Sequence, residues 1–145
     1  KTAVKIDHGG QVTTPRQCSF AVSINTGNVS GGNLVVYNVV LKNTGGNYNT
    51  SNGRFTAPVQ GKYFIATNHM TNNDAVYDNK YYTIRKNGSV YQRVYSSSGG
   101  SIHHRISWAG VITLNTGDYI DVYSENVKLY GLNTYYTDFS GHLLG

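Results

Sequence analysis

The segment from Ser124 to Thr137 holds the residue types best suited to ligand binding. Aromatic rings stack on the apolar face of a pyranose, while amide and charged groups meet its hydroxyls. The segment supplies both kinds, and we predict that it binds carbohydrate. The predicted carbohydrate-binding residues are Glu125, Asn126, Lys128, Tyr130, Asn133, Tyr135 and Tyr136. Aromatic residues also fill protein cores, so a packing role for each tyrosine is the alternative.

Two polar segments carry the oxygen atoms that a calcium ion needs. Calcium takes about six to eight oxygens from carboxylates, carbonyls and water. The first segment offers Asn72, Asn73, Asp74, Asp78 and Asn79, and the second offers Glu125, Asn126 and Asp138. From these we predict four metal ligands: Asp78, Glu125, Asn126 and Asp138. The alternative is that the same residues only shape turns.

No combination of residues points to catalysis. His103 and His104 are adjacent, so on a strand their side chains point to opposite faces and do not share one metal ion within a chain. One of them, repeated around a trimer axis, would form a three-histidine site; the alternative is that both are exposed or hydrogen-bonded. The sequence contains no G-x-S-x-G, H-E-x-x-H or phosphate-cradling glycine motif. We therefore predict that the protein is not an enzyme.

Composition favours a single soluble domain built of strands. The 145 residues include 17 Gly and 13 Tyr, which suit tight turns and pleated surfaces, and helical periodicity is absent. No apolar run approaches the roughly 20 residues that span a bilayer, so no membrane span is predicted. The net charge of +5 favours anionic partners. No Lys/Arg run exceeds two residues and no recognition helix is expected, however, so nucleic acid is not predicted as a partner.

Cys18 is the only cysteine in the chain, so an internal disulfide cannot form. It either cross-links two chains or serves as a small apolar residue. The interchain disulfide is therefore a candidate role for Cys18.

The elements that position these residues begin with alternating apolar residues around one turn. Phe55 and Ala57, then Tyr63 and Ile65, recur at a spacing of two, which places them on one face of a pleated strand. Pro58 presets the backbone for the turn between the two pairs. The pattern predicts a half-buried hairpin.

A second turn is specified more tightly. Asn87-Gly88 is typical of a type I′ turn, because both central positions need a positive φ. Such a turn pairs Lys86 with Ser89 and Ile84 with Tyr91. The register then predicts one shared face for Tyr82, Ile84, Tyr91 and Arg93.

Further strands are expected at 20–24, 63–71, 102–114, 119–123 and 138–144. The apolar run 34–41 is either a strand buried on both faces or one that bends between two sheets. Residues 1–17 have turn chemistry and little to bury, so we divide the chain into an N-terminal arm, 1–17, and a globular domain, 18–145.

Five segments in order resemble the globular C1q domain. Residues 53–64, GRFTAPVQGKYF, resemble its G-x-F-x-x-P-x-x-G-x-Y signature, and 139–144, FSGHLL, resemble its closing F-S-G-x-L-L. Between them, Lys86-Asn87-Gly88, Leu114–Asp118 and Leu129-Tyr130-Gly131 stand where the family has K-N-G, L-x-x-G-D and L-Y-G. The resemblance covers nearly the whole chain.

The resemblance implies a ten-stranded antiparallel jelly roll, usually a homotrimer, that binds ligands instead of transforming them. Relatives often carry a collagen repeat before the domain, which residues 1–17 lack. Many relatives also bind calcium near the trimer axis through an Asp, and His104 stands at that position, which argues against an axial site of that kind. Trp108 replaces a small residue, and we interpret it as core or trimer interface before ligand platform.

We therefore predict a secreted, collagen-free C1q-like lectin. It would act as a homotrimer, recognise glycans as in innate immunity, and use Ca²⁺ as a cofactor. The alternative is a protein-binding recognition or signalling ligand of the C1q and tumour-necrosis-factor superfamily.

Overall fold

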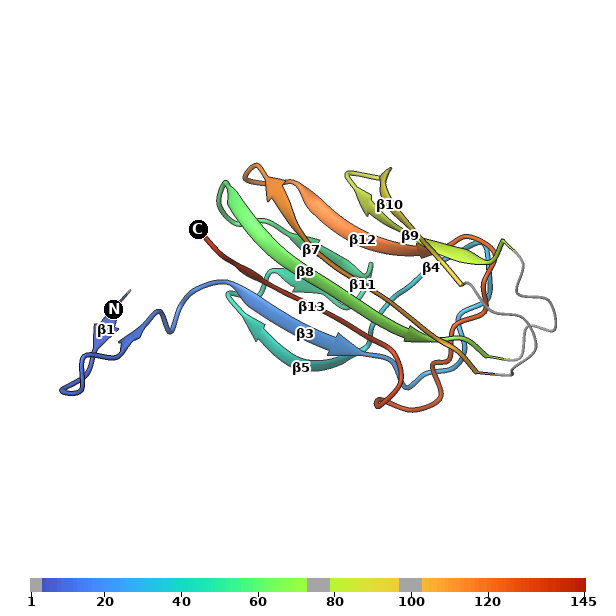
Figure 1. Cartoon of the computed structure of the whole chain (residues 1–145), viewed down its shortest axis with the longest axis horizontal. Coiled ribbons are helices and arrows are strands. Elements are labelled where there is room, and N and C mark those ends of the chain that lie inside the picture. The colour runs from blue at the N-terminus through green and yellow to red at the C-terminus, as the bar shows by residue number, and fades with distance from the viewer. Residues whose placement is uncertain (1–3, 73–78, 97–102) are drawn as a thin grey trace.

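The alternating sequence patterns form β-strands in the structure, a computed structural model in which residues 4–72, 79–96 and 103–145 are described (Figure 1). The described residues contain no helix, so no part of them is a helix able to cross a membrane. The strands are β1 (Lys5–Ile6), β2 (Val12–Thr13), β3 (Ser19–Ser23), β4 (Asn33–Leu34), β5 (Val39–Thr44), β6 (Tyr48–Asn49), β7 (Arg54–Thr56), β8 (Gly61–Met70), β9 (Tyr81–Lys86), β10 (Ser89–Tyr95), β11 (Arg105–Leu114), β12 (Tyr119–Ser124) and β13 (Asp138–Leu143).

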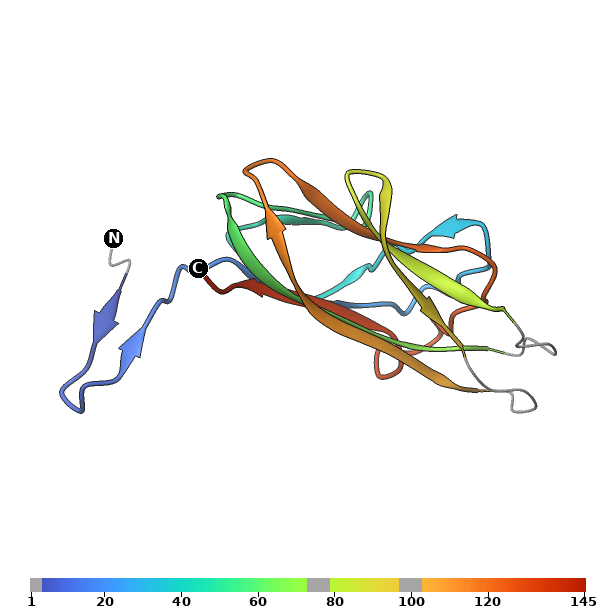
Figure 2. The same cartoon turned by 45° about the horizontal axis from the view of Figure 1, so that its top comes forward.

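Two antiparallel sheets lie face to face (Figure 2). The five-stranded sheet has the order β11-β8-β13-β3-β5. The six-stranded sheet has the order β10-β9-β12-β7-β6, with β4 also paired to β12. Sequence neighbours often lie in different sheets, as a jelly roll requires. The predicted all-β jelly roll is confirmed, and the described residues form thirteen short and long strands.

Aromatic side chains from both sheets fill the core between them. Phe20 on β3 stacks on Phe55 of β7 with ring centroids 4.5 Å apart, and it meets the edge of Phe139 at 4.8 Å. All three rings are at most 2% exposed. Burying one such side chain contributes about 1.5–3 kcal/mol, so this cluster ties the two layers together.

The turn at Pro58 connects the two sheets, and the predicted hairpin is wrong. Phe55 lies on β7 in the six-stranded sheet, whereas Tyr63 lies on β8 in the five-stranded sheet. Their rings meet edge to face across the core, 5.6 Å apart. A spacing of two fixes which face of a strand is buried, but it does not choose the neighbouring strand. The apolar run 34–41 crosses in the same way, from β4 into β5, so it bends between the sheets.

The Asn87-Gly88 turn forms as predicted, with φ of 51° and 80°. Ser89 pairs with Lys86, but a bulge after Val90 then shifts the register, so Ile84 faces Gln92 instead of Tyr91. The predicted shared face is therefore wrong. Tyr82 and Ile84 are fully buried in the core, whereas Tyr91 is 45% exposed. Arg93 pairs with Thr83 and not with Tyr82 or Ile84. A bulge adds one residue to one strand and turns the following side chains to the other face.

The N-terminal arm extends away from the sandwich as a two-stranded hairpin of β1 and β2 (Figure 1). Its apolar residues Val4, Ile6 and Val12 are more than half exposed. The arm meets the sandwich where the Gln17 side-chain amide donates to the Leu143 carbonyl. The C-terminal end of the chain lies at the same end of the molecule.

Candidate functional site

Three segments meet at the end of the sandwich opposite the termini. The amide of Tyr130 donates to Met70 O at 2.7 Å, which joins the β12–β13 loop to the end of β8. The amide of Thr71 donates to His104 O at 2.8 Å, which joins the same end of β8 to the residues before β11. Leu129, fully buried, anchors the loop through bridges to Val29 and Thr71. These backbone contacts hold the predicted loop against the body of the protein.

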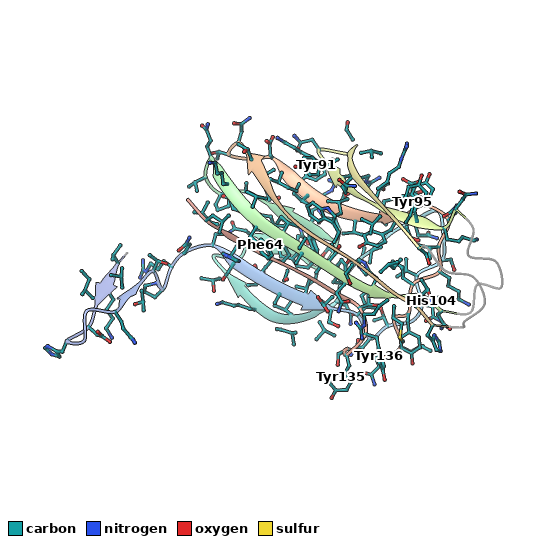
Figure 3. The ribbon with its side chains drawn as sticks, viewed as in Figure 1. Phe64, Tyr91, Tyr95, His104, Tyr135 and Tyr136 are labelled. Carbon is teal, nitrogen blue, oxygen red and sulfur yellow. The ribbon has the colours of Figure 1, made fainter. Side chains whose placement is uncertain are left out.

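We call Tyr130, Tyr135, Tyr136 and His103 the tyrosine cluster; Figure 3 labels Tyr135 and Tyr136. Tyr130 lies at its centre: the His103 ring meets it edge to face at 5.7 Å, and the Tyr136 ring does so at 5.1 Å. Tyr135 is 78% exposed and points away from the sandwich. Perpendicular ring pairs are favourable, so they fix the orientation of the cluster.

Hydrogen bonds order the loop around the cluster. Asn133 Oδ1 accepts from the Tyr135 amide at 3.1 Å, and Arg105 donates to Tyr136 O at 3.4 Å. From below, the buried Ser23 hydroxyl contacts two loop carbonyls, Thr134 O at 2.6 Å and Thr137 O at 2.9 Å. A loop held at this many points loses little entropy when a ligand binds. The exposed ring of Tyr135 is thus presented on an ordered support.

The remaining predicted carbohydrate residues are engaged elsewhere. Glu125 accepts a hydrogen bond from the Thr83 hydroxyl at 2.9 Å. Asn126 uses both ends of its amide, because Oδ1 accepts from the Tyr81 amide and Nδ2 donates to Asn79 O, each at 2.8 Å. These contacts pin the start of the loop to β9. Lys128 is half-buried, and its backbone carbonyl accepts from Asn72 at 2.9 Å. The structure therefore places Tyr130, Asn133, Tyr135 and Tyr136 together, and gives Glu125 and Asn126 a structural task.

The predicted calcium ligands are not gathered by the described residues. Asp138 accepts from the Asn68 amide at 3.0 Å within the five-stranded sheet, whereas Glu125 is bonded to the six-stranded sheet. Asp78, with Asn73 and Asp74, lies outside the described residues. No group of three or more His, Cys, Asp or Glu side chains in ranges 4–72, 79–96 and 103–145 is arranged to hold a metal ion. The described ligands alone fall short of the oxygen set that calcium needs, and the site stays a prediction.

Cys18 belongs to the core. It is 6% exposed, its sulfur accepts from Asn47 Nδ2 at 3.3 Å, and burial raises the pKa of the thiol. Disulfide formation needs an accessible thiolate. The environment thus favours the small apolar role, and an interchain bond would require this segment to open. Trp108 also packs against the core, and its ring lies perpendicular to that of Tyr91 with ring centroids 6.3 Å apart, in line with a packing role.

A polar group lies inside the core near the same end of β8. The Tyr37 hydroxyl is 2.6 Å from Nε2 of His69, and the Tyr82 ring packs edge-on against the imidazole at 4.5 Å. Thr67 in turn meets the Tyr82 hydroxyl at 2.8 Å. His69 is fully buried, its Nδ1 has no hydrogen-bond partner among the described residues, and burial lowers its pKa to about 3. The imidazole is therefore neutral in the folded protein at physiological pH.

Comparison with known proteins agrees with this architecture. A sequence model of the C1q domain matches residues 19–144. The chain belongs to the C1q family. Domains of this family are typically binding modules, and the aromatic loop at the end of this C1q domain is suited to that role.

Among curated relatives, the chain is similar to Caprin-2 of Danio rerio, with 28% identity over 122 residues that span 82% of this chain and 13% of that protein. It is also similar to the uncharacterized protein YqcC of Bacillus subtilis (strain 168), with 25% identity over 95 residues that span 61% of this chain and 26% of that protein. The C1q domain described here thus spans about an eighth and a quarter of these two relatives' lengths.

Solved structures share the fold at low sequence identity. The globular domain of zebrafish complement 1qA protein superposes with a TM-score of 0.72 at 18% identity, over 89% of this chain and 98% of that one. Eiger TNF from S. frugiperda gives 0.69 at 13% identity, over 90% and 94% of the two chains. Murine APRIL gives 0.66 at 16% identity, over 88% and 99%. The fold is therefore that of both the C1q and the tumour-necrosis-factor proteins.

Sequence reasoning missed two members of the site. His103 packs on Tyr130, and Arg105 donates to the loop carbonyl of Tyr136. His103 lies just before β11 and Arg105 is its first residue, so both are far from the loop in sequence. The only signal for their proximity is the sheet topology, which places the start of β11 beside the end of β8.

Proposed function

We propose that this C1q domain is a secreted carbohydrate-binding module that acts as a homotrimer and contacts sugar through the tyrosine cluster. The observation that carries the proposal is the Tyr135 ring, 78% exposed on a loop that hydrogen bonds and ring contacts hold in place. An aromatic face of this kind stacks on the apolar side of a sugar, and Asn133 and Arg105 supply polar groups beside it.

The outer faces of the two sheets differ in a way that supports assembly. On the five-stranded sheet, Ala109, Ala66, Ser140 and Ala21 fall in one register row across four strands. Small uncharged side chains of this kind let a second copy approach closely, and interface cores are depleted of charge. On the six-stranded sheet, in contrast, the outer face carries the buried Asp121, which Arg85 contacts at 2.7 Å and Arg54 at 3.5 Å. We infer that the five-stranded face meets other copies.

Assembly matters because one shallow sugar site is weak. Three sites on one particle gain avidity without new contacts, provided that a multivalent glycan spans them. The proposal therefore couples the tyrosine cluster at one end of the sandwich to the small-residue face along its side.

A glycan array probed with the wild-type protein and with Tyr135→Ala tests the proposal. We expect the wild type to bind a defined set of glycans and the variant to lose about 1–3 kcal/mol of affinity, as for other aromatic stacking contacts. Tyr95→Ala is the matched control, because Tyr95 is 51% exposed but lies on β10. Each array is run with calcium and with EDTA, which also tests the predicted Ca²⁺ assistance. An array without signal in both conditions, or equal loss in both variants, contradicts the proposal.

A second candidate is a protein-binding ligand, and the edge of the six-stranded sheet favours it. Val90, Tyr91 and Tyr95 on β10 are each about half exposed, and Tyr95 stacks on Tyr81 with ring centroids 4.7 Å apart. Exposed aromatic residues of this kind are typical of protein interfaces. Retention of a defined receptor that free sugars do not displace, and that Tyr91→Ala weakens, would favour this candidate over the lectin.

A further inference from the structure

The N-terminal arm carries a hairpin with one apolar face. Ile6 on β1 lies directly opposite Val12 on β2, so both side chains point to the same face. Lys5 and Thr13, the other register pair, point to the opposite face. Ile6 and Val12 are each more than half exposed, so no described part of the chain covers the apolar face.

Hydrogen bonds define the tip of this hairpin. Asp7 Oδ1 accepts from the amides of Gly9 and Gln11, each at 2.9 Å. Gly10, with a φ of +78°, donates to the Asp7 carbonyl at 3.1 Å. A two-stranded hairpin alone in water is only marginally stable, so one with a defined tip and an open apolar face is suited to docking on another surface.

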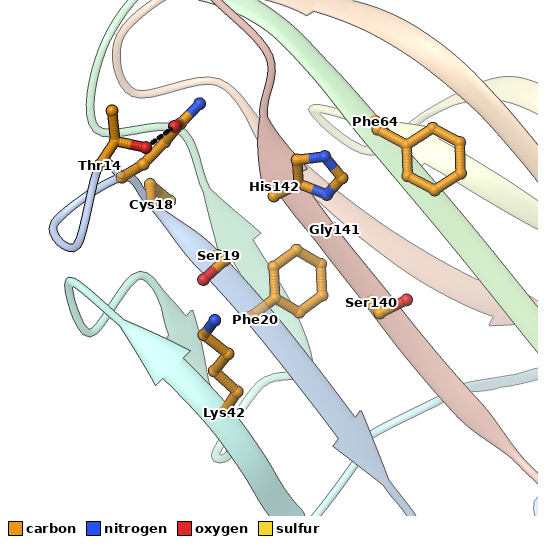
Figure 4. Close-up of a pocket in the computed structure, with 10 residues that line it drawn as sticks. Thr14, Cys18, Ser19, Phe20, Lys42, Phe64, Ser140, Gly141 and His142 are labelled. Carbon is orange, nitrogen blue, oxygen red and sulfur yellow. Dashed lines mark hydrogen bonds between the residues drawn. The ribbon is translucent and has the colours of Figure 1, made fainter. Parts of the chain in front are cut away.

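The turn at the base of the arm holds the hairpin off its own sandwich. The Gln17 amide donates to Thr14 O at 2.9 Å, and the Gln17 side chain is fixed by the Leu143 carbonyl. Figure 4 shows Thr14, with its hydrogen bond to Gln17, beside Cys18 at the start of β3. Beyond this turn the chain runs away from the two sheets (Figures 1 and 2). The hairpin therefore reaches its own sandwich only if the turn opens.

An open apolar surface lies at the same end of the sandwich. It consists of two hollows of about 430 and 310 Å³ that adjoin, because Arg16 and Leu143 line both. Leu144 lines the larger hollow, and Pro58 and Val59 line the smaller one. We call the two hollows together the terminal recess. Val59 and Leu144 are about half exposed, so the recess matches the hairpin in chemistry.

Charges complement this apolar match. Asp7 is the only carboxylate in residues 1–17, and it adjoins Ile6 at the tip of the hairpin. Arg16 is exposed in the lining of the terminal recess. Neither side chain belongs to an ion pair among the described residues. Opposite charges beside an apolar contact help to fix its register, so a hairpin seated in another copy's recess can place Asp7 beside Arg16.

The arm leaves the sandwich at the face that we infer to meet other copies. It leads into β3 of the five-stranded sheet, and Thr14 and Gln17 lie beside Ser19 and His142 of that face (Figure 4). Copies that meet through this face with their termini at one end bring each arm next to a neighbour's terminal recess. Each copy then gives one hairpin and receives one, as a closed ring of copies requires.

We propose that the hairpin of each copy docks in the terminal recess of a neighbouring copy. Ile6 and Val12 pack against Val59 and Leu144, and Asp7 lies beside the neighbour's Arg16. This inference rests on the homotrimer of the proposed function, and it makes the arm a clasp between copies.

Engineered cysteines test the contact. Oxidation of the Ile6→Cys, Leu144→Cys protein with copper phenanthroline should give covalent dimers and trimers on a non-reducing gel. Lys5→Cys with Leu144→Cys is the matched control, because Lys5 lies on the opposite face of the hairpin. The control should cross-link about tenfold more slowly, since only docked cysteines meet at a high effective concentration. Cys18 is buried and should not contribute, which the wild type and the single-cysteine variants check.

A double-mutant cycle tests the charge pair. Asp7→Asn removes the charge but keeps the oxygen that accepts from Gly9 and Gln11. Subunit exchange between two fluorescently labelled pools at low salt is the readout. Asp7→Asn and Arg16→Gln should each speed exchange about two- to fivefold, and the two together should speed it no more than either alone. Additive effects, or no effect of either, would overturn the proposed pairing.

Failure of this inference is distinguishable from failure of the proposed function. A wild type that light scattering finds monomeric refutes both the clasp and the homotrimer. An assembled wild type in which the Ile6→Cys and Lys5→Cys pairs cross-link equally, or not at all, refutes the clasp alone. Neither result bears on glycan binding by the tyrosine cluster.

Discussion

Lowering the pH should destabilise the protein through one buried side chain, His69. The imidazole is fully buried, and burial lowers its pKa from 6.5 to about 3. A base with a lowered pKa in the folded state contributes stability that is complete above its unfolded pKa. That stability is lost as the pH falls from the unfolded value toward the folded one. The direction is therefore loss of stability on acidification, starting near pH 6.5.

The size of the effect follows from the two pKa values. At about 1.36 kcal/mol per pKa unit, the full difference between 6.5 and about 3 corresponds to about 5 kcal/mol at the acid limit. Between about pH 7 and about pH 5, only the upper part of this range is crossed, and the expected loss is about 2 kcal/mol. This is a large share of the 5–15 kcal/mol that is typical for a folded domain.

The groups around His69 do not titrate in the same window. Tyr37 and Tyr82 face the imidazole, and burial raises the pKa of each hydroxyl above its usual value near 10. Elsewhere, hydrogen bonds from Asn87 and Asn115 lower the pKa of Asp118 to about 2, so the stability it contributes is lost only as the pH falls below its unfolded pKa of 3.8. Between about pH 7 and about pH 5, these three groups therefore do not contribute to the change in stability that is expected from His69.

Urea unfolding at a fixed protein concentration measures the effect, since assembly makes stability concentration-dependent. We expect the wild type to lose about 2 kcal/mol between about pH 7 and about pH 5. His69→Gln should lose much less, because an amide can keep the contact with Tyr37 but does not titrate. His142→Gln, an exposed histidine on β13, should retain the wild-type slope. A wild type whose stability is flat over this window, or a His69→Gln variant with the wild-type slope, would refute the reasoning.

Two other substitutions test the elements that frame the six-stranded sheet. Asp121→Asn should lower the free energy of unfolding in urea by about 3–5 kcal/mol, because Asp121 is fully buried and the Arg85 guanidinium would lose its bidentate carboxylate partner. A decrease below about 1 kcal/mol would mean that water replaces the carboxylate. Gly88→Ala should lower the free energy of unfolding by about 1 kcal/mol, because Gly88 has a φ of +80° that disfavours a Cβ. Ser89→Ala, at the next position, is the control and should leave this free energy nearly unchanged. Equal effects of the two substitutions would show that the turn has relaxed.

Sequence reasoning found about half of the candidate site. The β12–β13 loop was recognisable because aromatic and amide residues concentrate in one segment. In the structure, Tyr130 packs against Tyr136 in this loop, and Tyr135 is exposed next to Tyr136 in the chain. The structural role of Asn126 was not recognisable from the sequence. Its side-chain amide accepts a hydrogen bond from the first residue of β9, and an asparagine with this role cannot be told by residue type from one that binds sugar. His103 and Arg105 were missed because their proximity to the loop depends on long-range pairing of β11 with β8.

The sequence by itself determined what is local. Strand periodicity made the fold all-β, the C1q motifs identified the jelly roll, and Asn87-Gly88 specified its turn, because a positive φ at both positions is a property of two residues alone. Only the tertiary structure decided which strands are neighbours. Phe55 and Tyr63 have a hairpin pattern and yet lie in opposite sheets, and a bulge removed Tyr91 from the core. Alternation states which side of a strand avoids water, but pairing depends on the packing of both layers at once.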